Sequence, residues 1–175
     1  MFGPSKAARD TEFTAFVEGA TASLMRTAWL LTGNGGAAHE LVQAALVKTY
    51  AAWPRIRRGE ALAYARRVLI NQRTDTWRAT RHEVVTPETP EPRSSSRSHG
   101  VPSAAAVDDR DQVVRMLATL PEQQRKVIVL RYYTDLFEKA VADTLGISVG
   151  SVKSAASRGL ATLRDRYAAT EGGAR

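Results

Sequence analysis

Residues 137–158 read FEKAVADTLGISVGSVKSAASR, and the spacing of their small and apolar residues predicts two helices that meet at a tight turn. Ala142 allows a close helix crossing, Gly146 follows four residues later and can adopt the positive φ of a turn, and Val152 locks the second helix onto the first. Ser148 is placed to cap the second helix. The other inward positions are Val141, Leu145 and Ala155.

The second helix of this unit carries polar and basic residues on its outer side. They are Ser148, Ser151, Lys153, Ser154, Ser157 and Arg158. In a helix-turn-helix unit the second helix enters the major groove, where such side chains donate to phosphates and base edges. A purely structural hairpin has the same glycine turn, but the three-point spacing and the basic outer side favour DNA binding.

The rest of the chain also predicts helices, because apolar residues recur at intervals of three and four. In the first half we expect helices over 13–31, 37–53 and 61–80. In the second half we expect a helix from about Asp108, whose neighbouring acids Asp109 and Asp111 suit the positive end of a helix dipole. Pro121 fits the first turn of the next helix, 121–132. The expected fold class is all-α.

A composition break divides the chain in two. Residues 83–107 hold four of the seven prolines and the serine-rich piece Ser94–Ser98, with few large apolar residues. Such a segment buries too little apolar area to offset ordering, so it predicts a flexible Pro/Ser-rich linker. The expected organisation is therefore two small helical domains, 1–82 and 108–171, joined by this linker.

The positive charge is concentrated in two places. The 175-residue chain has a net charge of +7, and residues 55–82 alone contain eight arginines and two acids. Residues 149–175 contain five basic residues and two acids. Two separate basic segments indicate two anionic contact surfaces, and nucleic acid is the commonest anionic polymer in a cytoplasm. A solvated, arginine-rich helix face is the alternative interpretation.

Several functional classes lose their required residues. The chain contains no cysteine and only three scattered histidines, so we expect no metal site and no cofactor. The acids form no paired cluster, and no glycine-rich phosphate loop precedes a helix, so the chain is not expected to be an enzyme. The absence of a long apolar run and of signal-peptide features predicts no membrane insertion and a cytoplasmic location.

Taken together, the chain resembles the extracytoplasmic-function (group IV) sigma factors of the sigma-70 superfamily, two-domain subunits that direct RNA polymerase to promoters. The resemblance covers nearly the whole chain and rests on three stretches, which are ELVQAAL at 40–46, LPEQQR at 120–125 continuing to LRYY at 130–133, and LGISVGSVKS at 145–154. It implies that the first domain is sigma region 2 and the second is the helix-turn-helix of sigma region 4.

The resemblance also implies partners. The helix at 37–53 is similar to the family's docking surface for the coiled-coil clamp of the largest polymerase subunit. This implicates Glu40, Leu41, Gln43 and Leu46, although Leu41, Val42 and Leu46 fit a purely core role as well. The polymerase flap and promoter DNA are the other expected partners. Members of this family are often held inactive by an anti-sigma factor, which leaves such a partner open for this chain.

Two DNA contacts follow from the same resemblance. Residues 55–81 are similar to the part that opens and reads the minus-ten element, which implicates Arg66, Arg67, Asn71, Arg73, Trp77 and Arg78. Melting needs no hydrolysis if a polar pocket with nearby cations captures a base that has left the stack. Trp77 is equally compatible with half-buried packing. The segment from Ser148 to Arg158 is similar to the reader of the duplex minus-thirty-five element.

Four residues depart from the family pattern. His39 and Ala44 replace acids in the docking segment, which predicts weaker or tuned docking on polymerase. Phe137 replaces a capping serine, and Ala155 stands where an arginine is frequent, which predicts modest affinity for the minus-thirty-five element. The alternative function is a polymerase-independent helix-turn-helix regulator, but that hypothesis leaves the docking-like helix and the arginine cluster unexplained.

Overall fold

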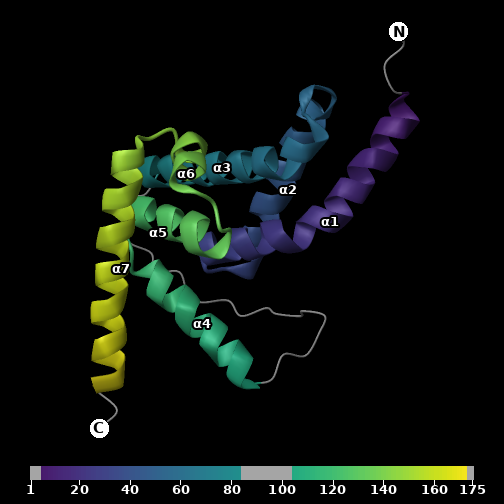
Figure 1. The fold of residues 1–175 in the computed structure, drawn as a ribbon. Helices are drawn as coiled ribbons and strands as arrows, with labels where there is room; N and C mark the ends of the chain where they lie inside the picture. The colour runs from purple at the N-terminus through teal and green to yellow at the C-terminus, as the bar shows by residue number, and fades with distance from the viewer. Residues whose placement is uncertain (1–4, 84–103, 173–175) are drawn as a thin grey trace. The chain divides into compact units, whose positions relative to one another are not determined.

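A computed structural model describes residues 5–83 and 104–172, and every described regular element is helical (Figure 1). The described residues divide into two compact units. One takes residues 5–28 and 36–83, and the other takes residues 29–35 and 104–172. The predicted all-α fold class is confirmed. The greater part of the predicted linker, 84–103, lies outside the described residues.

The first unit is built on three long helices, α1 (Lys6–Thr32), α2 (Gly35–Ala52) and α3 (Ala61–Glu83). Two short 3-10 turns, η1 (Trp53–Arg55) and η2 (Arg58–Glu60), connect α2 to α3. Apolar residues at intervals of three and four turn inward from all three helices. The buried ones include Ala20, Leu24, Leu41, Val42, Ala45, Trp53, Ala65 and Leu69.

Local chemistry sets the ends of these helices. The Ser5 hydroxyl accepts a hydrogen bond from the Ala8 amide at 3.2 Å and so caps α1. Gly33 adopts a φ of 68°, a left-handed conformation that ends α1 where its amide donates to the Trp29 carbonyl at 2.8 Å. Pro54 has no amide hydrogen, so α2 gives way at this point to the turn η1.

The second unit contains α4 (Ala104–Ala118), α5 (Glu122–Ile128), the π-helical turn η3 (Val129–Tyr133), α6 (Glu138–Leu145) and α7 (Val149–Gly172). The long helix α7 packs along both α5 and α6 (Figure 1). Close approach of α5 to α7 depends on Gly159, because a Cβ there would lie 3.0 Å from Ile128 Cγ1.

Three local predictions for the second unit were wrong. The helix α4 begins at Ala104, not near Asp108, so no acid lies in its first turn. Pro121 is the N-cap of α5 and not part of its first turn, because its ψ of 144° is extended. The α-helix ends at Ile128 instead of continuing to 132. Residues 129–133 widen into the π-helical turn, in which the Thr134 amide donates to the Val129 carbonyl.

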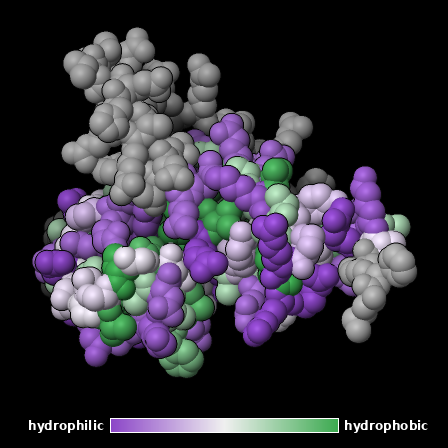
Figure 2. All heavy atoms as spheres, turned by 90° about the horizontal axis from the view of Figure 1, so that it is seen from above, coloured by the Kyte–Doolittle hydropathy of each residue, from purple (hydrophilic) through white to green (hydrophobic). Residues whose placement is uncertain are grey.

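Most large apolar side chains among the described residues are removed from the surface. Figure 2 shows hydrophilic side chains over most of the visible face, with hydrophobic ones in small separate spots. The exposed large apolar residues are therefore exceptions, and they are Val47, Tyr132, Tyr133, Phe137, Val149 and Tyr167. Exposed apolar side chains of this size are candidates for contact with a partner.

Candidate DNA-binding and polymerase-binding surfaces

The helix-turn-helix geometry is confirmed in α6 and α7. Gly146 has φ 65° and ψ 36°, a left-handed conformation that ends α6. Val152 is fully buried and Ala142 nearly so, which places both at the crossing of the two helices. The Ser148 hydroxyl accepts a hydrogen bond from the Ser151 amide at 3.1 Å, so the predicted cap of α7 is also confirmed.

The outer side of α7 presents the residues that the sequence selected. Ser151, Lys153, Ser154, Ser157 and Arg158 are all exposed, as is Ser148 before the helix. The Ser148 and Ser151 hydroxyls lie 2.9 Å apart and bond to each other. Lys153 Nζ lies 3.6 Å from Glu138 Oε2 on α6, which partly offsets its charge. Ser154, Ser157 and Arg158 therefore form the part of this face best placed to contact an external ligand.

The expectation that Ala155 costs a DNA contact was wrong. Ala155 is only 3 % exposed and lies one turn after Val152 on the inner side of α7. A side chain at this position points into the helix crossing and away from any groove-facing surface. Residue 155 therefore cannot be the reason for modest DNA affinity.

The missing cap at Phe137 is confirmed. No side chain caps α6, and the Phe137 ring is 83 % exposed at the N-cap position. A serine in this place would accept from a first-turn amide, so α6 lacks a stabilising contact worth about 1 kcal/mol.

The predicted docking face on α2 is only partly at the surface. Glu40 and Gln43 are exposed, and Gln43 Nε2 lies 3.2 Å from His39 Nε2. Leu41 is 6 % exposed, so its assignment to a contact surface was wrong and it belongs to the core. Leu46 is half-buried.

Sequence reasoning missed Val47 on this face. Its side chain is 69 % exposed, four residues after Gln43 and seven after Glu40, so the three share one side of α2. The available signal was an apolar residue that falls outside the inward spacing of Leu41, Val42 and Ala45.

The arginines of α3 do not form one uniform surface. Arg66 Nη2 donates to Ser23 Oγ on α1 at 3.1 Å, and burial lowers the pKa of its guanidinium. Arg67 is exposed beside the Tyr64 ring, 5.5 Å from the ring centre, and Asn71 is exposed one turn further along. Arg73 is half-buried. Trp77 and Arg78 lie in α3, but their side chains fall outside the described residues.

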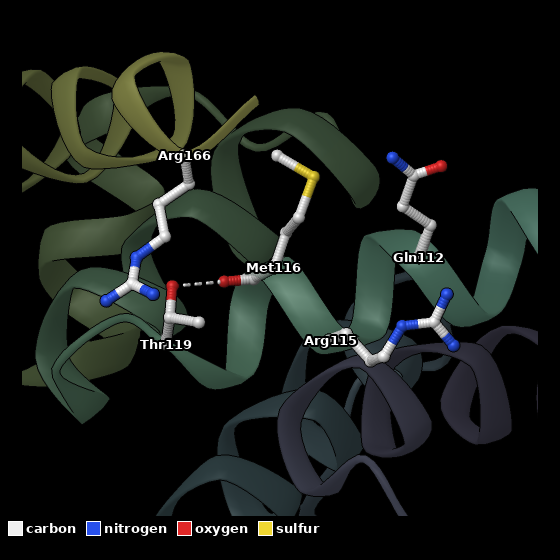
Figure 3. A pocket seen from close by; sticks show the side chains of 5 residues that line it. All are labelled: Gln112, Arg115, Met116, Thr119 and Arg166. Atoms are coloured by element: carbon white, nitrogen blue, oxygen red, sulfur yellow. Dashed lines mark hydrogen bonds between the residues drawn. The ribbon is translucent and has the colours of Figure 1, made fainter. Parts of the chain in front are cut away.

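A shallow hollow of about 430 Å³ lies between α4 and α7, lined by Gln112, Arg115, Met116, Thr119 and Arg166. Figure 3 shows the Arg115 and Arg166 side chains on opposite sides of it, without a common focus. The Thr119 hydroxyl donates to the Met116 carbonyl at 2.7 Å. The hollow contains none of the site residues predicted from the sequence.

The described part of the chain offers neither a cluster of metal ligands nor a membrane span. Among residues 5–83 and 104–172, no three histidine or acidic side chains come together as metal ligands. No described helix is both long enough and apolar enough to cross a membrane.

Comparison with protein families gives two matches in chain order. Sigma-70 region 2 matches residues 17–83, and sigma-70 region 4 matches residues 110–163. The RNA polymerase sigma-E factor of Streptomyces coelicolor is 36% identical over 164 residues, covering 91% of this chain and 88% of that protein. The ECF RNA polymerase sigma factor SigD of Mycobacterium tuberculosis is 30% identical over 141 residues, covering 78% of this chain and 66% of SigD.

Two solved structures share the fold. The sigma factor RpoE from Bartonella quintana, in complex with the anti-sigma factor NepR, has a TM-score of 0.72 at 20% identity and covers 88% of this chain and 95% of its own. CnrH, in complex with the cytosolic domain of CnrY, has a TM-score of 0.65 at 21% identity and covers 91% of this chain and 90% of its own.

Proposed function

Because this chain belongs to the extracytoplasmic-function group of the sigma-70 family of RNA polymerase sigma factors, we propose that it binds core polymerase and directs initiation through contacts with the minus-ten and minus-thirty-five elements. Residues 1–82 dock on polymerase and open the minus-ten element, 83–107 connect the domains, and 108–171 read duplex DNA. The protein acts in the cytoplasm and catalyses no reaction of its own.

The observation that carries this proposal is the geometry of α6 and α7. Their crossing is closed by Ala142 and Val152, and the outer side of α7 leaves Ser154, Ser157 and Arg158 exposed together. A helix of this kind fits the major groove, where a guanidinium can bind a guanine or a phosphate and hydroxyls can bind either.

The polymerase contact uses the outer side of α2, which we call the docking face and define by Glu40, Gln43 and Val47. An exposed apolar side chain beside two polar ones favours a partner that buries the valine and leaves the polar side chains at the wet rim of the contact. Since the sigma factor RpoE, which shares this fold, was solved in complex with an anti-sigma factor, an anti-sigma protein that competes with polymerase for this chain is part of the proposal.

The minus-ten contact uses exposed polar and basic residues of the first unit. Arg55 and Arg57 are exposed in the turns before α3, and Arg67 and Asn71 are exposed on α3 itself. Cations beside a polar side chain are what a site needs to hold a displaced strand and a base that has left the stack.

Run-off transcription with core RNA polymerase on genomic fragments tests the proposal. We expect discrete transcripts only when the protein is added, strongly reduced by Arg158→Ala and by the Arg67→Ala, Asn71→Ala pair. The matched control is Arg164→Ala, an exposed arginine further along α7. DNA binding without co-elution of core polymerase and without transcripts would instead establish the independent regulator.

A further inference from the structure

Three arginines lie close together in the turns between α2 and α3, and the sequence gives no reason to distinguish them. Arg55, Arg57 and Arg58 all fall within the segment that the proposed function assigns to the minus-ten element. In the structure the Arg57 side chain is 87 % exposed, whereas that of Arg58 is 47 % exposed. The difference lies in what the Arg58 guanidinium contacts.

Arg58 contacts three kinds of group within its own unit. Its guanidinium carbon lies 4.5 Å from the centre of the buried Trp53 ring, a cation–π contact. Its Nη1 donates to the Trp53 carbonyl at 3.3 Å, which belongs to the turn η1. Its Nη2 forms an ion pair with Glu12 Oε2 on α1. One side chain therefore joins the connecting turns to the first helix.

Two neighbours of Glu12 in α1 contact the end of α2 and the turn that follows it. The Phe13 ring packs edge-on against Trp53 with centres 5.0 Å apart. The Tyr50 hydroxyl donates to Asp10 Oδ1 at 2.6 Å, and this hydrogen bond raises the pKa of the phenol, so it stays a donor. Asp10, Glu12 and Phe13 all precede residue 17, where the match to sigma-70 region 2 begins.

We propose that Glu12 and Arg58 form a brace between α1 and the connecting turns, which fixes the conformation in which Arg55 and Arg57 meet promoter DNA. Arg58 is then a positioning residue and not a DNA contact. This inference rests on the proposed function for its promoter step only, because the brace itself is a property of the protein alone.

The turns between α2 and α3 depend on this brace because few other contacts fix their conformation. Backbone hydrogen bonds in the turns run from the Ile56 amide to the Trp53 carbonyl at 3.2 Å, from the Glu60 amide to the Arg57 carbonyl at 2.9 Å and from the Ala61 amide to the Arg58 carbonyl, and each spans only three residues. Fixing a segment before binding avoids an entropy cost at the moment of binding. The guanidinium of Arg58 would have to leave Trp53 and Glu12 to reach a phosphate. Arg57 would leave only Glu60, whose Oε1 lies 3.9 Å from its Nη1 in an exposed ion pair, so its cost is smaller.

The direction in which Glu12→Gln changes promoter binding and opening distinguishes a brace from a DNA contact at Arg58. If Arg58 bound phosphate, Glu12→Gln would remove a competing carboxylate and strengthen promoter binding. If the brace positions the turns, Glu12→Gln weakens promoter opening. The matched control is Glu18→Gln, the same change at an exposed position of α1 for which the structure records no ion pair among the described residues.

The first experiment is hydrogen exchange on the full-length protein. We expect Glu12→Gln and Arg58→Ala to speed exchange at the Ile56 and Glu60 amides by about threefold to tenfold, the size of a lost ion pair and cation–π contact. Glu18→Gln leaves both rates unchanged. Unchanged rates in Glu12→Gln would overturn the brace whether or not the protein directs transcription.

The second experiment measures holoenzyme binding and opening at a promoter found by run-off transcription. We expect Arg57→Ala to reduce the salt dependence of promoter binding by about one ion. Arg58→Ala should leave that salt dependence unchanged and lower the fraction of promoter complexes that are open. Glu12→Gln should also lower the open fraction. Both variants should still bind core polymerase. Faster exchange without any loss of opening would overturn the positioning role, and absence of transcripts from the wild type would overturn the proposed function instead.

Discussion

The two basic surfaces of this protein differ in whether their cationic side chains are paired within the protein or exposed to a partner. Between residues 55 and 73 the first unit has six arginines, yet Arg58 pairs with Glu12 and Arg66 donates to Ser23. Between residues 148 and 158 the outer side of α7 carries Lys153 and Arg158, and both are exposed. Charge summed along the sequence therefore overstates what the first unit presents to a partner, whereas both cations on this side of α7 stay exposed.

The largest expected effect concerns the inner side of α7. Ala155→Arg should destabilise the second unit by about 3 kcal/mol or more, because it forces a charge into the helix crossing. Thermal unfolding followed by circular dichroism checks this, with Ser154→Arg on the outer side as the control. A variant as stable as the wild type that also bound promoter DNA more tightly would restore residue 155 to the DNA surface.

The docking face gives the next effect. Val47→Lys should weaken binding to core polymerase about tenfold or more, since a buried valine contributes roughly 1.5 kcal/mol or more and would be replaced by a charge. Co-sedimentation or fluorescence titration with core enzyme measures this. Ala22→Lys, at an exposed position of α1, is the control, and equal affinities for both variants would exclude Val47 from the interface.

A pair of adjacent arginines sharpens the contrast within the first unit. Arg66→Ala should cost about 1 kcal/mol of stability through loss of the bond to Ser23, with little change in the salt dependence of promoter binding. Arg67→Ala should do the reverse, keeping stability and reducing that salt dependence by about one ion. Urea unfolding measures the stability of each variant, and salt titrations measure its promoter binding. Identical results for the two variants would contradict the assignment of Arg66 to the protein interior and of Arg67 to DNA.

The smallest effect compares the two helices of the helix-turn-helix. Phe137→Ser should stabilise the second unit by about 0.5 to 1 kcal/mol by supplying the cap that α6 lacks, and Ser148→Ala should remove a similar amount from α7. Chemical unfolding of both variants measures the difference. A loss of stability in Phe137→Ser would mean that the exposed ring contributes to folding.

The sequence predicted the helices and the crossing well because both depend on local rules. Spacing of apolar residues at three and four predicted the all-α class, and Ala142, Gly146 and Val152 each met a local steric requirement of the helix crossing. The start of α4 and the π-helical turn after Ile128 were missed, because helix ends without a strong stop signal depend on tertiary contacts.

The site residues were predicted less well, because a residue type does not reveal its direction. Leu41 was assigned to the docking surface with a core role as the alternative, and its burial confirms the core role. Ala155 is buried as its inward position predicted, so the DNA contact expected from an arginine there was wrong, whereas Val47 is exposed and went unnoticed. Arg58 and Arg66 look like any other arginine in the sequence, and only their partners on α1, far away along the chain, assign them an internal role.

Permanganate footprinting of a promoter fragment tests the central claim most directly, namely that the first unit opens DNA and the second reads the duplex. Unpaired thymines near the minus-ten element should appear only when core polymerase and this protein are both present. At DNA saturation, Arg57→Ala should lower their reactivity, while Arg158→Ala should lower occupancy and leave the reactivity of bound DNA unchanged. Loss of thymine reactivity in saturated Arg158→Ala complexes, or no reactive thymines with the wild type, would contradict the account.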